Sequence, residues 1–230
     1  MLKNFIKLFV PLILTRNYWV LKFNNYFNVN KFNYEDNYYN RHAFILRSLC
    51  KFKINEVNYL EIGTDENQVF STIPLKKGAK IGVDPLKGGT TRAKSDDFFK
   101  SNKIFFNVIF IDGLHTYDQT KKDCMNAMNC LKSGGIILLH DLLPTNKYES
   151  KTHRSGESWK VGCELSKSQN VEFRIVNIDR GIGILKLKEN YKYIEQKDIL
   201  SHNFDDFINL YYKNLPIINC NDALKFIDGD

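Results

Sequence analysis

Short apolar runs that lead into acidic residues recur along this chain of 230 residues. Residues 107–111 (Asn-Val-Ile-Phe-Ile) precede Asp112, and residues 135–139 (Gly-Ile-Ile-Leu-Leu) lead through one histidine to Asp141. Continuous apolar runs of this length are typical of strands buried on both faces of a parallel sheet. Because open α/β sheets bind ligands at the carboxyl ends of their strands, the pattern predicts a small-molecule site beside these acids.

The rest of the pattern predicts an α/β fold. Of two earlier apolar runs, one contains Glu61 and the other precedes Asp84. The later runs at 171–176 and 181–187 flank a short turn, which predicts an antiparallel hairpin. Strands that alternate with helices predict a doubly wound, mostly parallel sheet, here with an antiparallel edge hairpin. Helices are expected at 41–52, 67–74, 95–100, 116–131 and 158–166.

The chain divides into a central domain and two flanking segments. We expect an N-terminal appendage at 1–40, the main domain at 41–188 and a C-terminal appendage at 189–230. The apolar stretch near the N-terminus is too short to span a bilayer and contains a proline, so packing is favoured over membrane contact through residues 1–22. A long polar loop is expected at 144–157, and loops of this length are often functional.

Composition narrows the class of protein. The chain is 43% hydrophobic and 26% charged, as in globular proteins, and its net charge is +7. This charge permits a nucleic-acid partner, but no dense run of arginine and lysine supports one. The five cysteines have no CxxC spacing, which favours a reducing, cytoplasmic setting without a disulfide framework.

Five motifs carry a family resemblance. The chain resembles the class I S-adenosylmethionine-dependent methyltransferases, and within them a small O-methyltransferase-like group, over about residues 56 to 188. The resemblance implies a Rossmann-like methyltransferase sheet, and it extends to Gly-Glu-Ser-Trp-Lys at 156–160, which is similar to the group's GDVWK segment. The motifs are Leu-Glu-Ile-Gly at 60–63, Gly-Val-Asp-Pro at 82–85, Ser-Asp-Asp-Phe-Phe at 95–99, Phe-Ile-Asp-Gly-Leu-His-Thr-Tyr at 110–117 and Leu-Leu-His-Asp at 138–141.

The resemblance implies a set of cofactor contacts. In the turn after the first strand, the Glu61 carboxylate would suit the cationic sulfonium and amino group of the cofactor. Gly63 in the same turn would let the backbone approach the ligand. This turn lacks the second glycine that many members have, and the dinucleotide fingerprint G-x-G-x-x-G is absent. Asp84 would accept from the ribose hydroxyls. The full set implied for S-adenosylmethionine is Glu61, Gly63, Thr64, Asp84, Ser95, Asp96, Asp112 and Gly113.

The resemblance also implies a catalytic centre. Asp112, His140 and Asp141 match the positions at which metal-dependent O-methyltransferases hold a divalent ion. Such an ion lowers the pKa of an acceptor hydroxyl. Magnesium, manganese or iron are the candidate ions, and the histidine favours the transition metals over magnesium. His115 is the candidate general base, so the expected catalytic residues are His115, Asp112 and Asp141.

The expected function is O-methylation of a hydroxyl on a sugar, a glycan or a secondary metabolite. Tyr117, Trp159 and Lys160 are candidate walls of the acceptor pocket, although aromatic residues at such positions can also fill the core. A metal-dependent hydroxylase stays open as an alternative, because His115, His140 and an aspartate loosely match a two-histidine-one-carboxylate iron site. A protein that binds or methylates nucleic acid is the third hypothesis, and a homo-oligomer is open.

Overall fold

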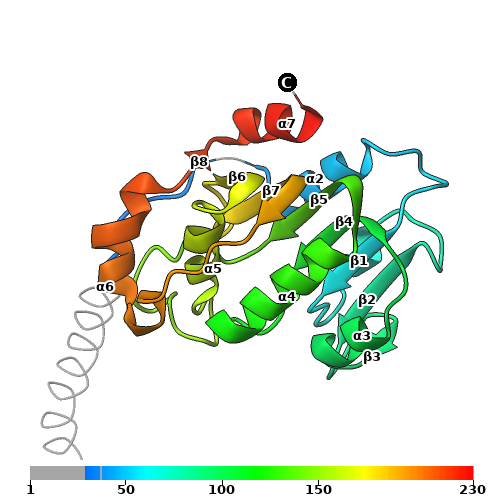
Figure 1. Ribbon diagram of the computed structural model, residues 1–230, viewed down its shortest axis with the longest axis horizontal. Coiled ribbons are helices and arrows are strands. Elements are labelled where there is room, and N and C mark those ends of the chain that lie inside the picture. Colours follow the sequence, from blue (N-terminus) through cyan, green and yellow to red (C-terminus); the bar gives the residue numbers. More distant parts are fainter. Residues whose placement is uncertain (1–28, 37, 230) are drawn as a thin grey trace, which may run out of the picture.

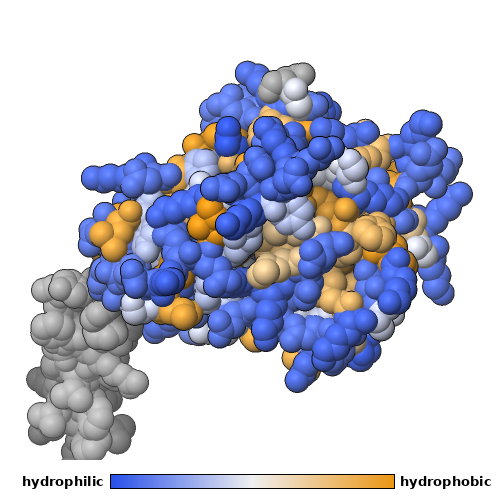
Figure 2. Space-filling view, viewed as in Figure 1, coloured by the Kyte–Doolittle hydropathy of each residue, from blue (hydrophilic) through white to orange (hydrophobic). Residues whose placement is uncertain are grey.

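The computed structural model describes residues 29–36 and 38–229. Membrane or packing contacts expected for residues 1–22, and most of the appendage expected at 1–40, lie outside this part of the chain. Within it, no helix combines the length and the apolar character that crossing a membrane would require. Polar side chains cover most of the face shown in Figure 2, with apolar side chains gathered right of centre.

One mixed sheet forms the middle layer of the molecule (Figure 1). Its strand order is β3-β2-β1-β4-β5-β7-β6-β8. The pairs among β3, β2, β1, β4 and β5 are parallel, whereas β7 is antiparallel to both of its neighbours. The strands are β1 (Tyr59–Ile62), β2 (Lys80–Asp84), β3 (Thr91–Arg92), β4 (Phe106–Ile111), β5 (Leu131–Leu139), β6 (Gln169–Val176), β7 (Ile182–Lys192) and β8 (Ile217–Ile218).

Helices cover both faces of the sheet, as the period-two alternation of its strands requires. On β4, Ile109 and Ile111 belong to the apolar cluster that includes residues of α3, α4 and α5, whereas Val108 and Phe110 belong to the cluster with α2 and α7. Figure 1 shows these two helical layers on opposite sides of the sheet. The helices are α2 (Arg41–Leu49), α3 (Ser95–Ser101), α4 (Tyr117–Asn129), α5 (Ser158–Leu165), α6 (Phe204–Asp206) and α7 (Cys220–Asp228).

The expected α/β architecture, mostly parallel with an antiparallel edge, is confirmed. One expected helix is wrong: within 67–74 only a 3₁₀ turn forms, at Phe70–Thr72. The strand expected from 136 begins earlier, at Leu131, so the glycine pair at 134–135 lies within β5. β7 also continues past residue 188, and β8 adds the C-terminal segment to the sheet.

The order of the strands in the sheet determines where a ligand site can form. β1 lies between β2 and β4, so the chain leaves β1 and β4 toward opposite faces of the sheet. A crevice opens at such a reversal of strand order, beyond the carboxyl ends of the strands. Gly63 follows β1 and Asp112 follows β4, which puts both residues at this crevice.

We predict that α7 is an integral part of the core. Ile227 of α7 is fully buried in the cluster that contains Phe44 of α2. Ile227→Ala should lower the free energy of unfolding by about 3 kcal/mol, because it removes buried methyl groups and leaves a cavity. Leu210→Ala, at a position that is 54% exposed, is the control and should cost less than about 0.5 kcal/mol in denaturant titrations. Equal, small effects of both variants would contradict this role of α7.

Candidate active site

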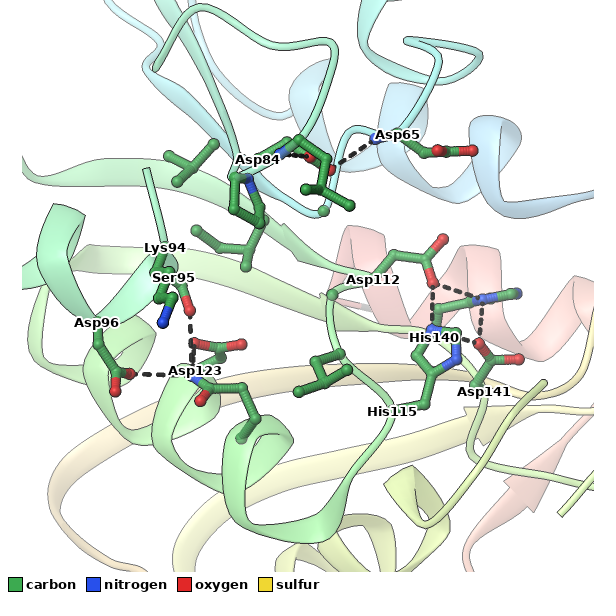
Figure 3. A pocket seen from close by; sticks show the side chains of 18 of the residues that line it. Asp65, Asp84, Lys94, Ser95, Asp96, Asp112, His115, Asp123, His140 and Asp141 are labelled. Atoms are coloured by element: carbon green, nitrogen blue, oxygen red, sulfur yellow. Dashed lines mark hydrogen bonds and ion pairs between the residues drawn. The ribbon is translucent and has the colours of Figure 1, made fainter. Parts of the chain in front are cut away.

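A cavity of about 630 Å³ opens at the carboxyl ends of β1, β2, β4 and β5. This volume is within the range of small-molecule sites. Its lining is rich in carboxylates, and it divides into two ends (Figure 3): one holds Ser95, Asp96 and Asp123, and the other holds Asp112, Asp141 and two histidines. The lining carboxylates are Asp65, Asp84, Asp96, Asp112, Asp123 and Asp141, and the lining cations are Arg41, Lys94 and Arg180, together with His115 and His140.

The first turn brings backbone, not a side chain, to the cavity. Gly63 lines it with φ +84°, and a Cβ there would overlap the backbone carbonyl of Asp112. Only glycine fits this left-handed, closely packed position. Thr64 is buried behind the turn, with its hydroxyl near the Lys87 carbonyl, and is not part of the lining.

Glu61 differs from the expectation, because its carboxylate does not line the cavity. It is 1% exposed and accepts a 2.6 Å hydrogen bond from the Tyr59 hydroxyl. Burial raises the pKa of Glu61 to about 8, against the opposing effect of the Tyr59 hydrogen bond. The expected direct contact between Glu61 and a cationic ligand is therefore corrected to a buried role beneath the first turn.

Asp84 lines the cavity at the end of β2 and also organises the loops around it. Its Oδ1 accepts from the backbone N–H groups of Leu86 and Lys87, at 2.8 and 3.0 Å, and its Oδ2 accepts from that of Asp65, at 3.0 Å. Burial opposes ionisation, but these three hydrogen bonds outweigh it and lower the pKa of Asp84. The carboxylate is thus held ionised, and its Oδ2 has capacity for a further donor.

At the Ser95 end of the cavity, the side-chain amide of Gln119 contacts three hydrogen-bond acceptors. The Gln119 amide nitrogen lies 3.1 Å from the Ser95 hydroxyl, 2.9 Å from Asp96 and 3.0 Å from Asp123. Burial raises the pKa of Asp123 to about 6. Sequence reasoning missed Asp123 and Gln119, although their separation of four residues places both on one face of α4.

At the opposite end, two carboxylates and two histidines converge (Figure 3). His140 Nδ1 lies 3.1 Å from Asp112 Oδ1 and 3.1 Å from Asp141 Oδ2. His115 Nε2 lies 3.5 Å from Asp112 Oδ1 and 3.2 Å from Asp141 Oδ2. The structure therefore brings together all four residues that the sequence placed at this centre.

His140 is buried with both ring nitrogens facing acceptors. Its Nε2 is 2.7 Å from the backbone carbonyl of Asp179, while its Nδ1 faces Asp112 and Asp141. Burial alone would lower the pKa of His140, but the charges of Asp112 and Asp141 outweigh this and raise it well above its ordinary value. The Nδ1 of His140 therefore faces the same two carboxylates as the Nε2 of His115 does, and the ligand role expected for His140 stays a prediction.

His115 is the histidine that fits a ligand set. One oxygen of Asp112, one oxygen of Asp141 and one ring nitrogen of His115 all lie within 4.8 Å of one another. The His115 Nδ1 is hydrogen-bonded to the Arg154 carbonyl, so its Nε2 is the atom directed at the two carboxylates. A carbonyl partner of this kind fixes the tautomer and orientation of metal-bound histidines.

The loop at 144–157 supports these groups from behind. The Ser155 hydroxyl donates to Asp141 Oδ1 at 2.8 Å, and the Glu157 N–H donates to the His115 carbonyl at 2.8 Å. Gly156 has φ +58°, and a Cβ there would overlap the His115 carbonyl. This contact explains why a glycine opens the Gly-Glu-Ser-Trp-Lys segment. None of the loop residues lines the cavity, so the loop holds Asp141 and His115 in position instead of forming the cavity wall.

The expected acceptor walls are core residues. Trp159 is 2% exposed and packs against Phe207 with ring centroids 4.9 Å apart. Tyr117 donates to Glu164, and the Lys160 ammonium donates to Glu157 and to the Leu200 carbonyl. None of the three expected wall residues lines the cavity, which agrees with their alternative interpretation as core.

Two arginines complete the centre and were missed from the sequence. Arg41 donates to Asp112 Oδ2 at 2.7 Å and forms a forked pair with Asp179, at 2.8 and 2.9 Å. Arg180, in the same turn as Asp179, also lines the cavity. Arg41 begins a helix about 70 residues before Asp112, and no local sequence signal links two positions so far apart.

Part of the chain is similar to a known protein family. Residues 59–142 match a family model described as a methyltransferase domain. Over this segment, which is less than half of the chain, the sequence is similar to that family. No curated protein matches the sequence.

Several solved structures are similar to this chain. Cofactor-bound Rv0187 from MTB is 14% identical, with 68% of this chain and 84% of that chain covered and a TM-score of 0.49. The SAH-bound Podospora anserina methyltransferase PaMTH1 is 13% identical, with 64% and 77% covered and a TM-score of 0.46. An O-methyltransferase from Bacillus cereus in complex with SAH is 14% identical, with 74% and 89% covered and a TM-score of 0.45. At TM-scores below 0.5, these similarities support no conclusion about substrate or mechanism.

The buried Glu61 generates a prediction on stability. With its pKa raised from 4.5 to about 8, Glu61 is neutral in the folded protein and ionised in the unfolded chain between these values. The unfolded state then binds fewer protons, so this group makes the protein less stable as pH rises from 4.5 to 8. Glu61→Gln stays neutral at every pH. Its free energy of unfolding at pH 8 should exceed that of the wild type by about 2 kcal/mol or more, and the difference should be smaller at pH 5.

Denaturant titrations across this pH range would measure the effect. Glu66→Gln is the control, because the Glu66 side chain is 64% exposed beside Lys87. Its stability should follow the wild-type pH dependence. Parallel curves for Glu61→Gln and the wild type would contradict a neutral, buried Glu61.

Proposed function

We propose that this methyltransferase transfers the methyl group of S-adenosylmethionine to a hydroxyl of a small-molecule acceptor, with assistance from a divalent ion. One observation supports this most strongly: Asp112, Asp141 and His115 converge at one end of a cavity whose remaining lining suits a cationic nucleoside cofactor. A sugar, a glycan or a secondary metabolite is the class of acceptor that we propose.

The cavity fits S-adenosylmethionine by its chemistry. Six lining carboxylates suit a ligand that carries a sulfonium and an ammonium group, and Gly63 and Gly113 let the ligand approach the backbone. We assign Asp84 to the ribose hydroxyls and Ser95 and Asp96 to the adenine, which orients the methyl group toward Asp112. Glu61 and Thr64 act beneath the first turn without touching the cofactor.

The ligand set fits a divalent ion. Asp141 Oδ2 is buried and accepts no hydrogen bond of good geometry among the described residues, and the ring nitrogens of His115 and His140 lie 3.2 and 3.1 Å from it. An oxygen with this surrounding suits a bound cation. We propose Asp112, Asp141 and His115 as the ligands, a set that suits manganese or iron better than magnesium. A bound ion at this position would lower the pKa of the acceptor hydroxyl.

The surrounding residues hold these groups in place. Arg41 and His140 face Asp112 from two sides, so its carboxylate is ionised: burial alone would raise the pKa of Asp112, but these cations lower it well below its ordinary value. The Arg154 carbonyl orients the ring of His115. Positions fixed in this way supply the alignment of acceptor and methyl group that accounts for much of the rate of such transfers.

A role of His115 as general base is less well supported than its role as ligand. Its Nε2 faces two carboxylates, and although burial alone would lower the pKa of His115, the Asp112 hydrogen bond and the charge of Asp141 raise it. The hydroxylase alternative needs both histidines as ligands, and the match of residues 59–142 to a methyltransferase family favours methyl transfer over it. We place the protein in the cytoplasm, a proposal supported by five free cysteines.

Cofactor binding is the first test. Calorimetric titration of S-adenosylmethionine into the wild type should give a micromolar dissociation constant. Asp84→Ala should weaken binding at least tenfold, because it removes a charged acceptor and three hydrogen bonds that order the adjoining loops. Asp97→Ala, on an exposed position of α3, is the control and should bind as the wild type does. Wild-type protein that binds no cofactor would overturn the proposed function.

Metal binding is tested separately from activity. Titration of manganese into chelated protein should show one site, and His115→Ala should weaken it at least tenfold because one of three ligands is lost. His153→Ala, an exposed histidine on the supporting loop, should not change the affinity. Unchanged manganese affinity in His115→Ala, with methyl transfer abolished, would instead identify His115 as the base. A wild type that binds no manganese would overturn the metal proposal.

A further inference from the structure

The turn between β6 and β7 directs a cation into the cavity. Arg180 lines the cavity beside Asp141 and His140, at the end where the methyl group would be transferred. Asp179 and Arg180 both have left-handed backbones, with φ +44° and +62°. Non-glycine residues in this region are strained, and such strain is concentrated at functional sites. Both side chains of the strained turn serve the same centre, Asp179 by binding Arg41 and Arg180 by lining the cavity.

The two arginines of the cavity differ in what they bind. Arg41 uses its Nε and both terminal nitrogens on Asp112 and Asp179, at 2.7 to 2.9 Å. Arg180 makes no side-chain hydrogen bond within the part of the chain that the structure describes, and its nearest carboxylate oxygen there, on Asp141, is 3.8 Å away. Its side chain is 35% exposed. Arg41 therefore uses three of its five N–H donors on protein carboxylates, whereas the guanidinium of Arg180 makes no hydrogen bond to the described residues and is available to a ligand.

We propose that Arg180 binds an anionic group of the methyl acceptor, so that the acceptor is a hydroxylated carboxylic acid or phosphate ester. This inference rests on the proposed function, because it assigns the acceptor to the end of the cavity beside His115. A guanidinium binds carboxylate and phosphate oxygens through paired N–H donors, and such charge-assisted hydrogen bonds are stronger than neutral ones.

The surroundings of Arg180 suit such an acceptor. Leu114, which is 60% exposed, also lines the cavity and immediately precedes His115. An acceptor ring that packs on Leu114 can place its hydroxyl near the Asp112 and Asp141 carboxylates while its anionic group reaches Arg180. The carboxylates do not repel this group strongly, because Asp112 is already paired with Arg41 and with His140.

Matched ligands that differ only in charge would test this inference. The first series compares D-glucose with D-glucuronate and D-glucose 6-phosphate, and the second compares 3,4-dihydroxybenzyl alcohol with 3,4-dihydroxybenzoate. Each is titrated into chelated, SAH-loaded protein, so that an anion bound by a metal is not counted. In at least one series an anionic member should bind at least tenfold more tightly than its neutral counterpart. The sugar series also distinguishes a carboxylate from a phosphate.

Variants assign the preference to Arg180. Arg180→Gln should abolish the preference for the anion, and Arg180→Lys should keep part of it because the charge remains. Arg174→Met removes an exposed cation from β6 of the same hairpin and should keep the full preference. Thermal unfolding and SAH affinity should match the wild type in each variant, which separates a lost contact from a misfolded turn.

The outcomes separate this inference from the proposed function. If SAH binds and no anionic member is preferred, or if the preference survives in Arg180→Gln, the inference is overturned and the methyltransferase function stands. If SAH does not bind, the proposed function fails, and titration of the same anions into the unliganded protein still tests Arg180. If the anionic ligand binds more tightly than the neutral one and Arg180→Gln abolishes the difference, an anion site at Arg180 is supported. Equal affinities for the two ligands would overturn the anion site.

Discussion

The site depends on keeping the Asp112 carboxylate ionised at the end of the central strand β4, where only 16% of the side chain is exposed. Removing the Asp112 carboxylate from water is costly unless cations and hydrogen bonds replace the water. Arg41 and His140 supply this compensation at 2.7 and 3.1 Å. These two cations in turn require Asp179, which accepts from both, so that the pKa of Asp179 is also lowered despite its burial. One desolvated charge thus explains why the site needs residues from α2, β5 and the β6–β7 turn.

This network ties distant parts of the chain to the cofactor fold. Arg41 lies at the start of α2, outside the segment that matches the methyltransferase family, and α2 packs with α7 from the far end of the chain. Loss of packing between these helices would move the Arg41 guanidinium relative to Asp112. Residues outside the matched segment 59–142 therefore place a positive charge at the site, even though α2 and α7 contain none of the family motifs.

The sequence correctly places residues that directly follow a strand, but it does not show in which direction a side chain points. The apolar runs located β4 and β5, and with them Asp112 and Asp141. Glu61 was placed at the cavity because the family resemblance puts it in the first turn, yet the period of two along a strand puts it on the same face as Tyr59, away from the cavity. That signal was present in the sequence. The burial of His140 was not predictable, because it depends on Asp179, 39 residues later, and on the return of the β6–β7 turn to the sheet edge.

Three residues at the site have strained backbone conformations that lower the stability of the fold. Asp141, Asp179 and Arg180 all have positive φ, at +66°, +44° and +62°, and each such residue costs about 1 kcal/mol or more. The surrounding packing holds them there: Gly181 lies so close to Leu143 that a Cβ would overlap its backbone, and the N–H groups of Leu142 and Leu143 bond to the turn carbonyls of Gly181 and Arg180. A chain selected for stability alone would place glycine or asparagine at these positions. Asp141 and Arg180 line the end of the cavity that holds the two histidines, and Asp179 contacts Arg41 and His140 there. The strained residues therefore all lie at the cavity, and this placement is the physical reason for proposing that the turn binds a ligand.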